Sequence, residues 1–211
     1  MIGTRVDWVP RIWTWSRTID KMLKRSLVLI GVSTWLAPAL VQARECLGVS
    51  FPEQVQVAGT SLALNGLGLR QATLFKVNVY VAALYMPKPT ADASVILAAA
   101  TPYEMQLHFV RNVGAADIAK GWVEGFERNG QGTQGSSDER VATLRGWMTD
   151  IKSGESMIFS FQPGTGLVVS VNGSVKGTIR GDDFGRTFLS IWLGVPPNPE
   201  IKVGLLGGRC E

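Results

Sequence analysis

Alternating apolar and polar positions predict β-strands through much of the chain. Four segments repeat with a period of two, as strands with one buried face do: residues 105–111, 157–161, 167–171 and 174–179. Asn172-Gly173 joins the last two segments and is the strongest hairpin signal in the sequence. These segments predict a mostly antiparallel sheet.

The strand pattern before residue 74 is less regular. Residues 49–57 alternate loosely, and Gly59-Thr60 then turns into Leu62, Leu64 and the Asn65-Gly66 step, which together predict a hairpin-like start. Gly66-Leu67-Gly68 does not continue into a glycine-rich cradle, and we place it between strands. The glycines therefore do not indicate a phosphate site.

Residues 74–84 are β-branched and aromatic with a period near two. We expect a central strand there, with Phe75 and the valines on one face. Lys76, Asn78 and Tyr80 then follow each other on the second face, which is predicted to be polar.

Helical patterns separate these strands. We predict helices over residues 93–100, over 117–129, over 139–151 after a capping box of Ser136 and Glu139, and over 183–192 with Asp183 as N-cap. Strands and helices in this order indicate an α+β domain, with the helices gathered on one face of the sheet. Such a layer leaves a cleft in which small apolar ligands bind.

The N-terminus has the pattern of a signal peptide. An apolar run of about 14 residues, 27–40, follows two basic residues and precedes Ala43. The run is shorter than the roughly 20 residues that a membrane-spanning helix needs, although a retained anchor stays an alternative. We expect residues 1–43 to be a leader and 44–211 the folded domain, with Met22 as an alternative start. The predicted location is periplasmic or secreted, with membrane contact only through the signal peptide.

The net charge of +4 resides in this leader. Residues 1–43 hold six of the 21 basic and two of the 17 acidic side chains, so the remaining domain has no net charge. We therefore expect no nucleic acid partner, because nucleic acid binding depends on an excess of basic side chains.

Two cysteines, Cys46 and Cys210, lie near the two ends of the predicted domain. An exported chain passes through an oxidising compartment, so a disulfide between them is predicted, with two unpaired thiols as the alternative. His108 is the one histidine. We predict no metal site and no cofactor, since metal-ligand spacing is lacking.

Arg70 is the most informative polar residue. It ends the run Asn65–Arg70, just before the strand predicted at 74–84. A guanidinium that approaches a core needs a polar or anionic partner, because an unpaired buried charge is costly. A carboxylate suits its paired N–H donors. A bound ligand and a structural salt bridge both remain open.

Five stretches match a known family pattern: Asn65–Arg70, Phe75–Tyr85, Trp122–Phe126 with Asn129, Gly166–Gly173 and Phe188–Gly194. With them, residues 48–207 resemble the chalcone isomerase-like proteins of bacteria. The resemblance implies an open-faced β-sandwich of chalcone isomerase type, in which a large, mostly antiparallel sheet carries a helical layer on one face.

The resemblance also implies two kinds of function. Enzymes of this family cyclise hydroxychalcones, whereas related members without that activity bind fatty acids through an arginine that holds the carboxylate. Arg70 matches that arginine. In an enzyme, it would polarise the carbonyl on which negative charge develops.

The other catalytic positions of the enzymes do not match. Lys76 stands in place of their threonine, and Asp117 and Glu124 stand near the positions of their tyrosine and asparagine. We therefore predict a non-catalytic protein that binds a fatty acid or similar small amphipathic anion. An isomerase that uses Arg70 on a chalcone-like enone is one alternative, and a structural or partner-binding module without ligand is another.

The predicted ligand-binding residues are Arg70, Tyr80, Lys76, Trp122 and Phe126. Arg70 would hold the carboxylate, and Tyr80 would supply a second donor, as a tyrosine does in the fatty-acid-binding relatives. Trp122 and Phe126 would line the helix side of the cleft, with ordinary core packing as their alternative role. The predicted partner is a small hydrophobic or acyl ligand, and no protein partner is indicated.

Overall fold

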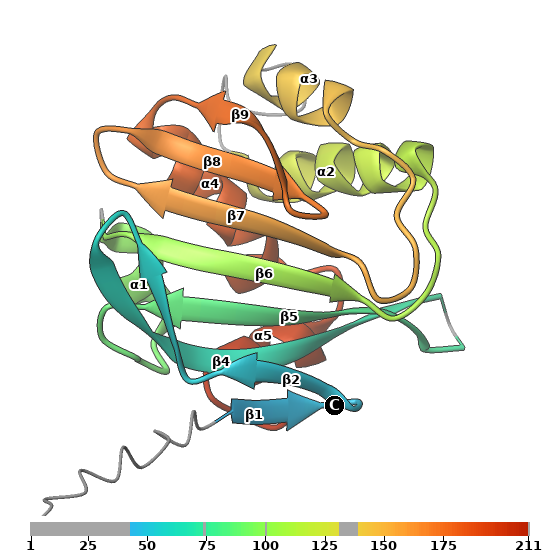
Figure 1. Ribbon diagram of the computed structural model, residues 1–211, viewed down its shortest axis with the longest axis horizontal. Helices are drawn as coiled ribbons and strands as arrows, with labels where there is room; N and C mark the ends of the chain where they lie inside the picture. Colours follow the sequence, from blue (N-terminus) through green and yellow to red (C-terminus); the bar gives the residue numbers. More distant parts are fainter. Residues whose placement is uncertain (1–42, 74, 100, 131–138, 211) are drawn as a thin grey trace, which may run out of the picture. The chain divides into compact units, whose positions relative to one another are not determined.

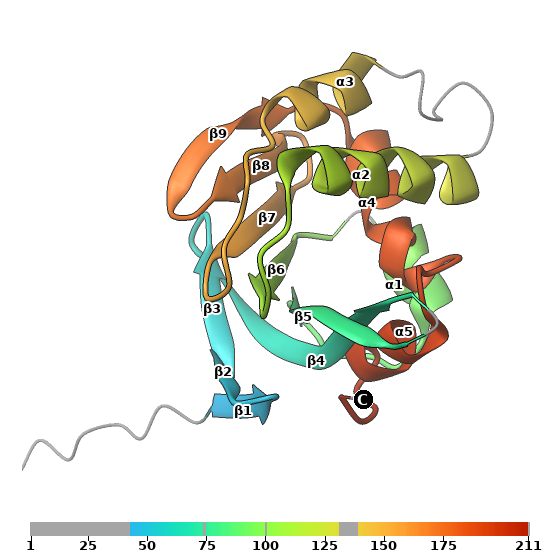
Figure 2. The ribbon, with the colours of Figure 1, turned by 90° about the vertical axis from the view of Figure 1, so that its right-hand side faces the viewer.

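Seven antiparallel strands form a curled sheet in a computed structural model that describes residues 43–73, 75–99, 101–130 and 139–210 (Figures 1 and 2). Each strand pairs with the next one along the chain. The strands are β3 (Gln54–Val57), β4 (Thr60–Ala72), β5 (Val77–Met86), β6 (Tyr103–Phe109), β7 (Ser156–Gln162), β8 (Gly166–Val171) and β9 (Ser174–Ile179). A separate hairpin, which the sequence did not predict in full, consists of β1 (Ala43–Cys46) and β2 (Val49–Pro52).

Helices lie along the concave face of the sheet (Figure 2). They are α1 (Ala93–Ala98), α2 (Ala115–Asn129), α3 (Glu139–Gly146), α4 (Asp182–Leu193) and α5 (Pro199–Leu205). The predicted α+β, open-faced architecture is confirmed. Within the described ranges, no helix has the length and apolar character needed to cross a membrane.

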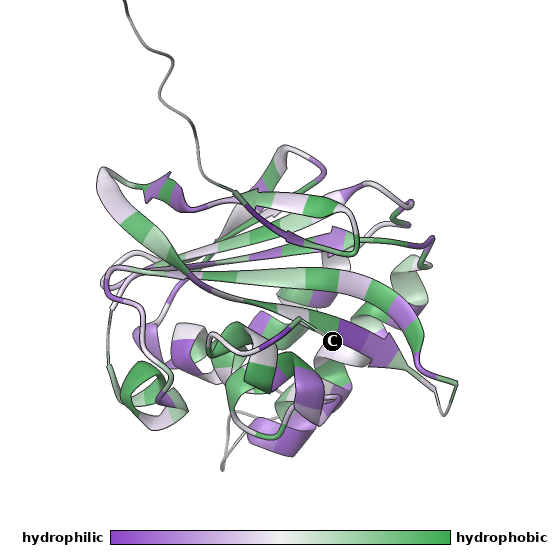
Figure 3. Cartoon of the chain, turned by 90° about the horizontal axis from the view of Figure 1, so that it is seen from below, coloured by the Kyte–Doolittle hydropathy of each residue, from purple (hydrophilic) through white to green (hydrophobic). Residues whose placement is uncertain are grey.

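The main core is an aromatic cluster between α2, α4 and the sheet. Trp122 and Phe126 of α2 meet Phe188 of α4, whose ring centroid lies 4.7 Å from that of Phe159 on β7. Figure 3 shows hydrophobic residues recurring along the strands and on the helices that pack against them. The apolar side chains of the predicted helix 117–129 and of the predicted strand 157–161 thus pack into one core.

A second apolar cluster lies on the opposite face of β4 and β5. It holds Val81 and Tyr85 from β5, with Phe51 and Cys46 from the small hairpin. The second face of residues 74–84 was predicted to be polar. This prediction is wrong for the residues after Tyr80, because the strand is buried on both faces there. The strand also begins at Val77, so Phe75 lies in the preceding turn.

The predicted turn before Thr60 is present, since β3 and β4 pair from Val57 and Thr60, but the Asn65-Gly66 step is not a turn. Both residues lie inside β4, where the Asn65 side chain is buried, donates to the carbonyl of Leu205 (2.6 Å) and accepts from the Thr90 N–H (2.7 Å). An added Cβ at Gly66 would lie 2.2 Å from the carbonyl oxygen of Gly204. The glycine thus permits the backbone of α5 to approach the strand, and α5 itself was not predicted.

Two predicted helix boundaries also differ. The helix predicted over 139–151 ends at Gly146, and Ile151 instead forms a β-bridge with Val113. Helix α4 has Gly181 as N-cap, and Asp183 pairs with Arg140 (2.8 Å) rather than capping the helix. The predicted cap residue Ser136 lies outside the described residues, as does the predicted leader except for Ala43.

The predicted disulfide between Cys46 and Cys210 is present. It joins β1 to the segment that follows α5 across a sequence separation of 164 residues. In the chain-entropy model, a loop of this length stabilises the fold by on the order of 4–5 kcal/mol. The segment after α5 is therefore covalently held to the small β1–β2 hairpin.

Replacing Gly68 with alanine should destabilise the protein. The new Cβ would lie 2.4 Å from the carbonyl oxygen of Ile201, so β4 and α5 would have to separate. We expect a loss of about 2 kcal/mol or more in the free energy of unfolding, measured by chemical denaturation. The matched control is Gly146→Ala, where a Cβ meets nothing within 4 Å. Equal stability of the two variants would contradict this packing.

The protein should lose stability above pH of about 10. Burial raises the pKa of all three tyrosines, Tyr80, Tyr85 and Tyr103, and the charges of Glu104 and Glu53 raise that of Tyr85 further. Their phenols therefore stay protonated in the folded chain at a pH that ionises them in the unfolded chain. Stability is fully present below the unfolded pKa and falls as the pH rises through it, by up to about 1.4 kcal/mol per pH unit for each tyrosine.

Chemical denaturation across this pH range tests the loss. In Tyr103→Phe, the fall in the free energy of unfolding per pH unit should be smaller by the contribution of one tyrosine. This variant also loses the 2.7 Å hydrogen bond from the Tyr103 hydroxyl to the carbonyl of Gly185. Absorbance of tyrosinate gives an independent check. Ionisation of all three phenols near pH 10 in the folded protein would contradict the expected behaviour.

Candidate functional site

A cavity of about 650 Å³ lies between α2 and the inner face of β4, β5 and β6. Its volume falls within the range typical of small-molecule sites. Apolar side chains form much of its wall: Val79, Leu107, Phe109, Ile118, Trp122 and Ile191. The predicted cleft between the sheet and the helices is therefore present.

Strand pairing places Arg70 and Tyr80 side by side on this wall. Arg70 of β4 is directly opposite Tyr80 of β5, which is opposite Phe109 of β6. Because directly paired residues project to the same face of a sheet, their side chains form one row along the cavity. The rings of Tyr80 and Phe109 are in contact, with centroids 5.4 Å apart.

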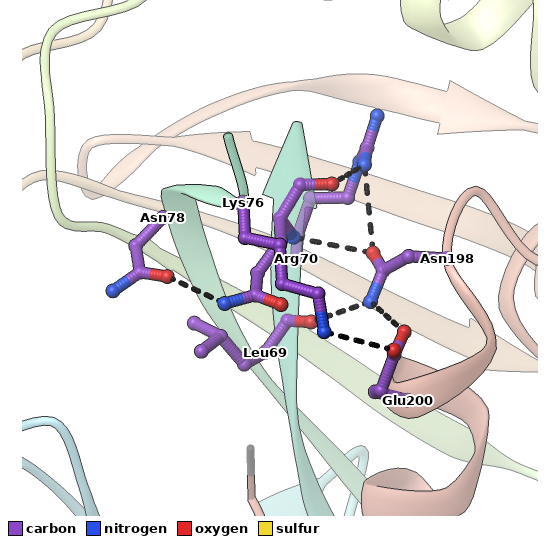
Figure 4. A network of polar contacts seen from close by, with 7 residues as sticks. Leu69, Arg70, Lys76, Asn78, Asn198 and Glu200 are labelled. Atoms are coloured by element: carbon purple, nitrogen blue, oxygen red, sulfur yellow. Dashed lines mark hydrogen bonds and ion pairs between the residues drawn. The ribbon is translucent and has the colours of Figure 1, made fainter. Parts of the chain in front are cut away.

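The Arg70 guanidinium is held at one nitrogen only. Its Nη1 donates to the carbonyl of Gln71 and to Oδ1 of Asn198, which lies 3.4 Å away (Figure 4). Across the described ranges, no carboxylate lies within ion-pair distance of Arg70, and its Nε and Nη2 have no hydrogen-bond partner. The alternative in which Arg70 forms a structural salt bridge is therefore not found among the described residues.

Asn198 is the support for this arginine, and the sequence pattern missed it. Its Nδ2 donates to the carbonyl of Leu69 (3.1 Å), and its Oδ1 accepts from the N–H of Gln71 (3.2 Å). Asn198 precedes Pro199, a pattern typical of a helix start. That pattern predicts a cap, whereas the side chain reaches the neighbouring strand and makes no capping bond.

Tyr80 has a free hydrogen to donate. Trp192 Nε1 donates to the Tyr80 hydroxyl oxygen at 3.0 Å, and an indole N–H can only be the donor. The phenol proton is therefore directed elsewhere, and no described residue accepts it. Burial raises the pKa of Tyr80, while the bond from Trp192 and the charge of Arg70 lower it by less. Tyr80 thus remains a neutral donor beside Arg70.

The other predicted ligand residues are not all at the cavity. Trp122 lines it, with its Nε1 donating to Met148 Sδ at 3.0 Å. Phe126 is buried in the aromatic core and is not part of the cavity wall. Lys76, with 69% of its side chain exposed, forms an ion pair with Glu200 (3.5 Å) and also lies outside the wall. The structure therefore brings Arg70, Tyr80 and Trp122 together, but not Phe126 or Lys76.

Charged residues surround the outer part of the cavity. Asp117 and Glu124, which stand near the catalytic positions of the enzymes, both line it and are exposed. Glu124 is shared by Lys120 (3.8 Å) and Arg128 (3.7 Å), one helical turn away on either side. Together with Arg70 and Arg111, the lining has two more basic than acidic side chains. This balance favours an anionic ligand.

No group of metal-binding side chains occurs in the part of the chain that the structure describes. The site thus consists of an apolar cavity, a guanidinium with an open edge and a neutral phenol. This set can hold an oxyanion by charge-assisted hydrogen bonds while an apolar group fills the remaining volume.

Comparison with known proteins agrees with the architecture. A solved structure of a fatty-acid binding protein of Arabidopsis thaliana superimposes with a TM-score of 0.62, at 18% sequence identity, over 78% of this chain and 96% of that chain. No curated protein sequence matches significantly. The profile of the family described as chalcone isomerase-like matches residues 43–207. The chain therefore belongs to the chalcone isomerase-like family.

Proposed function

We propose that this chain binds a fatty acid or similar small amphipathic anion without converting it. The carboxylate lies on Arg70 and Tyr80, and the apolar chain fills the cavity along Trp122. The observation that carries this proposal is the open edge of Arg70, because a guanidinium that has no ion pair within the described residues lines a cavity with many apolar wall residues. The fatty-acid binding of the Arabidopsis neighbour, which shares the fold, supports the same ligand class.

The energetics favour such a ligand. Each buried methylene contributes about 0.8 kcal/mol, and a hydrogen bond to a charged group contributes about 1.5–3 kcal/mol. A ligand that combines one carboxylate with an alkyl chain uses both parts of the site. In contrast, the isomerase alternative needs a network of hydroxyl groups. Near the positions of the tyrosine and the asparagine of the enzymes, this chain has the carboxylates of Asp117 and Glu124 instead.

We further propose that the protein is exported, because its N-terminus has the pattern of a signal peptide. Residues 1–43 then form the signal peptide, with Met22 as an alternative start, and residues 44–211 the mature domain. Cleavage after Ala43 removes only the first residue of β1. The Cys46–Cys210 disulfide supports a periplasmic or secreted location, because such bonds persist in oxidising compartments.

Arg70→Ala should weaken binding of a fatty acid by about 10- to 100-fold. Residues 44–211, expressed into a periplasm, are analysed by native mass spectrometry for acyl ligands that co-purify, and then by calorimetry with saturated acids from octanoic to stearic acid. The matched control is Arg145→Ala, which alters an exposed arginine of α3 outside the cavity wall.

The methyl ester of the same acid separates charge recognition from apolar burial. The wild type should prefer the acid to the ester, and Arg70→Ala should bind both about equally. Failure of the wild type to bind any acid would contradict the proposal. Turnover of a hydroxychalcone that requires Arg70 would favour the isomerase instead, and a well-folded protein with neither property would favour the structural module.

Tyr80→Phe should have a smaller effect on the same binding. The variant keeps the ring contact with Phe109 but loses the donated hydrogen bond, so we expect affinity to fall by about 3- to 10-fold. Trp192 Nε1 also loses its acceptor, so the free energy of unfolding should fall by about 1–3 kcal/mol. Unchanged affinity for the acid in this calorimetric comparison would remove Tyr80 from the site.

A further inference from the structure

Trp192 of α4 contacts the candidate site without lining the cavity. Its side chain is fully buried, and the cavity wall includes the neighbouring Ile191 but not Trp192. Its Nε1 donates to the Tyr80 hydroxyl oxygen at 3.0 Å. A buried indole N–H keeps such a partner, because an unpaired donor away from water is costly. The N–H of Trp192 therefore acts on a bound ligand through Tyr80.

This hydrogen bond decides the role of the phenol. A phenolic hydroxyl donates its one hydrogen and accepts through its oxygen. Since the indole N–H occupies the oxygen, the hydroxyl is left to act as a donor on the cavity wall, where it lies beside Arg70. A guanidinium has N–H donors and no acceptor. Both polar groups at this end of the cavity thus offer hydrogens to a ligand.

The acceptors that contact Arg70 already hold donors of the protein (Figure 4). Asn198 Oδ1 accepts from Arg70 Nη1 (3.4 Å) and from the N–H of Gln71 (3.2 Å). The carbonyl of Gln71 accepts from the same Nη1. A hydrogen brought by a ligand would therefore compete with hydrogens that these oxygens already bind.

The acidic residues of the wall do not supply an acceptor at the phenol. Asp117 and Glu124 lie on α2, where both are exposed. Of the described charged side chains, Arg70 is the one that affects the pKa of Tyr80. The polar end of the cavity at Arg70 and Tyr80 therefore differs from its charged outer part.

From this arrangement we propose that Trp192 is a positioning residue that makes the Arg70–Tyr80 end of the cavity donor-only. A donor-only site takes a head group that accepts every hydrogen bond, as an ionised carboxylate does. It rejects a primary amide of the same shape, because the amide NH₂ would face N–H and O–H donors. The inference rests on the proposed acyl ligand and specifies its head group.

Calorimetry of residues 44–211 with dodecanoic acid, its primary amide and its methyl ester tests this selectivity, at about pH 7.5, where the acid is ionised. Wild-type protein should bind the acid about 100-fold or more tightly than the amide. Trp192→Phe should reduce this ratio about tenfold, because the Tyr80 oxygen becomes free to accept from the amide. The acid-to-ester ratio should stay unchanged, since neither of these head groups carries a donor.

Three further variants separate positioning from packing. Phe184→Leu is the matched control, because Phe184 is buried on α4 about two helical turns from Trp192 and lies outside the cavity wall. It should lower stability and leave both ratios unchanged. A chain with benzothienylalanine at position 192 keeps the double ring without the N–H, and should reproduce the effect of Trp192→Phe even where the smaller side chain impairs folding. In a Tyr80→Phe background, Trp192→Phe should no longer change the acid-to-amide ratio.

The ratios also distinguish the inference from the proposed function. An acid-to-amide ratio that is the same with and without the N–H at position 192 would overturn the role of Trp192, while acid binding itself would stand. A shift of the ester ratio as large as that of the amide ratio would assign Trp192 to packing alone and would overturn it too. Wild-type protein that binds none of the three compounds would contradict the acyl ligand, and the inference with it.

Discussion

The close packing of α5 against the glycines of β4 determines where the site can form. Gly66 and Gly68 let the backbone of the helix approach the strand within a distance that any side chain would prevent. Asn198, at the start of the same helix, then reaches the backbone of Leu69 and Gln71 and the guanidinium of Arg70. The orientation of Arg70 is therefore a consequence of backbone packing, and the disulfide at Cys210 holds the far end of this segment.

This arrangement leaves a cation where an apolar cavity begins. Arg70 remains partly exposed, and the carbonyl and amide groups around it are neutral, so desolvation is limited. No carboxylate among the described residues pairs with its charge. Tyr80 beside it stays neutral, because burial outweighs the opposing effects of Trp192 and Arg70 on its pKa. A cation next to a neutral donor is suited to stabilise a carboxylate that keeps its charge. The same pair offers no base for proton abstraction, which agrees with a binding role.

Much of the fold could be predicted from local patterns. The alternation in β7, β8 and β9, the Asn172-Gly173 turn and the helical periodicity of α2 are each short-range signals, and each is found in the structure. Arg70 and Tyr80 could be selected as site candidates from the family pattern, and the structure places them in one row.

Most of the misses share one physical cause, which is contact between segments far apart in the sequence. Gly66 suggested a turn because a glycine that permits close backbone packing and one that permits a turn look alike in sequence. Asn198 was not predicted, because it reaches Leu69 and Gln71 on a strand about 130 residues away and helix α5 is too short to give a clear periodic pattern. Phe75 suggested a buried strand face, whereas the unfavourable backbone of the turn exposes it.

The central claim is that the free edge of Arg70 is an oxyanion site. A crystal structure of residues 44–211 with palmitic acid tests it most directly. The account predicts that one carboxylate oxygen lies within hydrogen-bond distance of Arg70 Nη2 or Nε, that the other meets the Tyr80 hydroxyl, and that the alkyl chain contacts Trp122. A carboxylate bound at Arg111 or Lys120 instead, or a cavity without acyl density at saturating ligand, would contradict it.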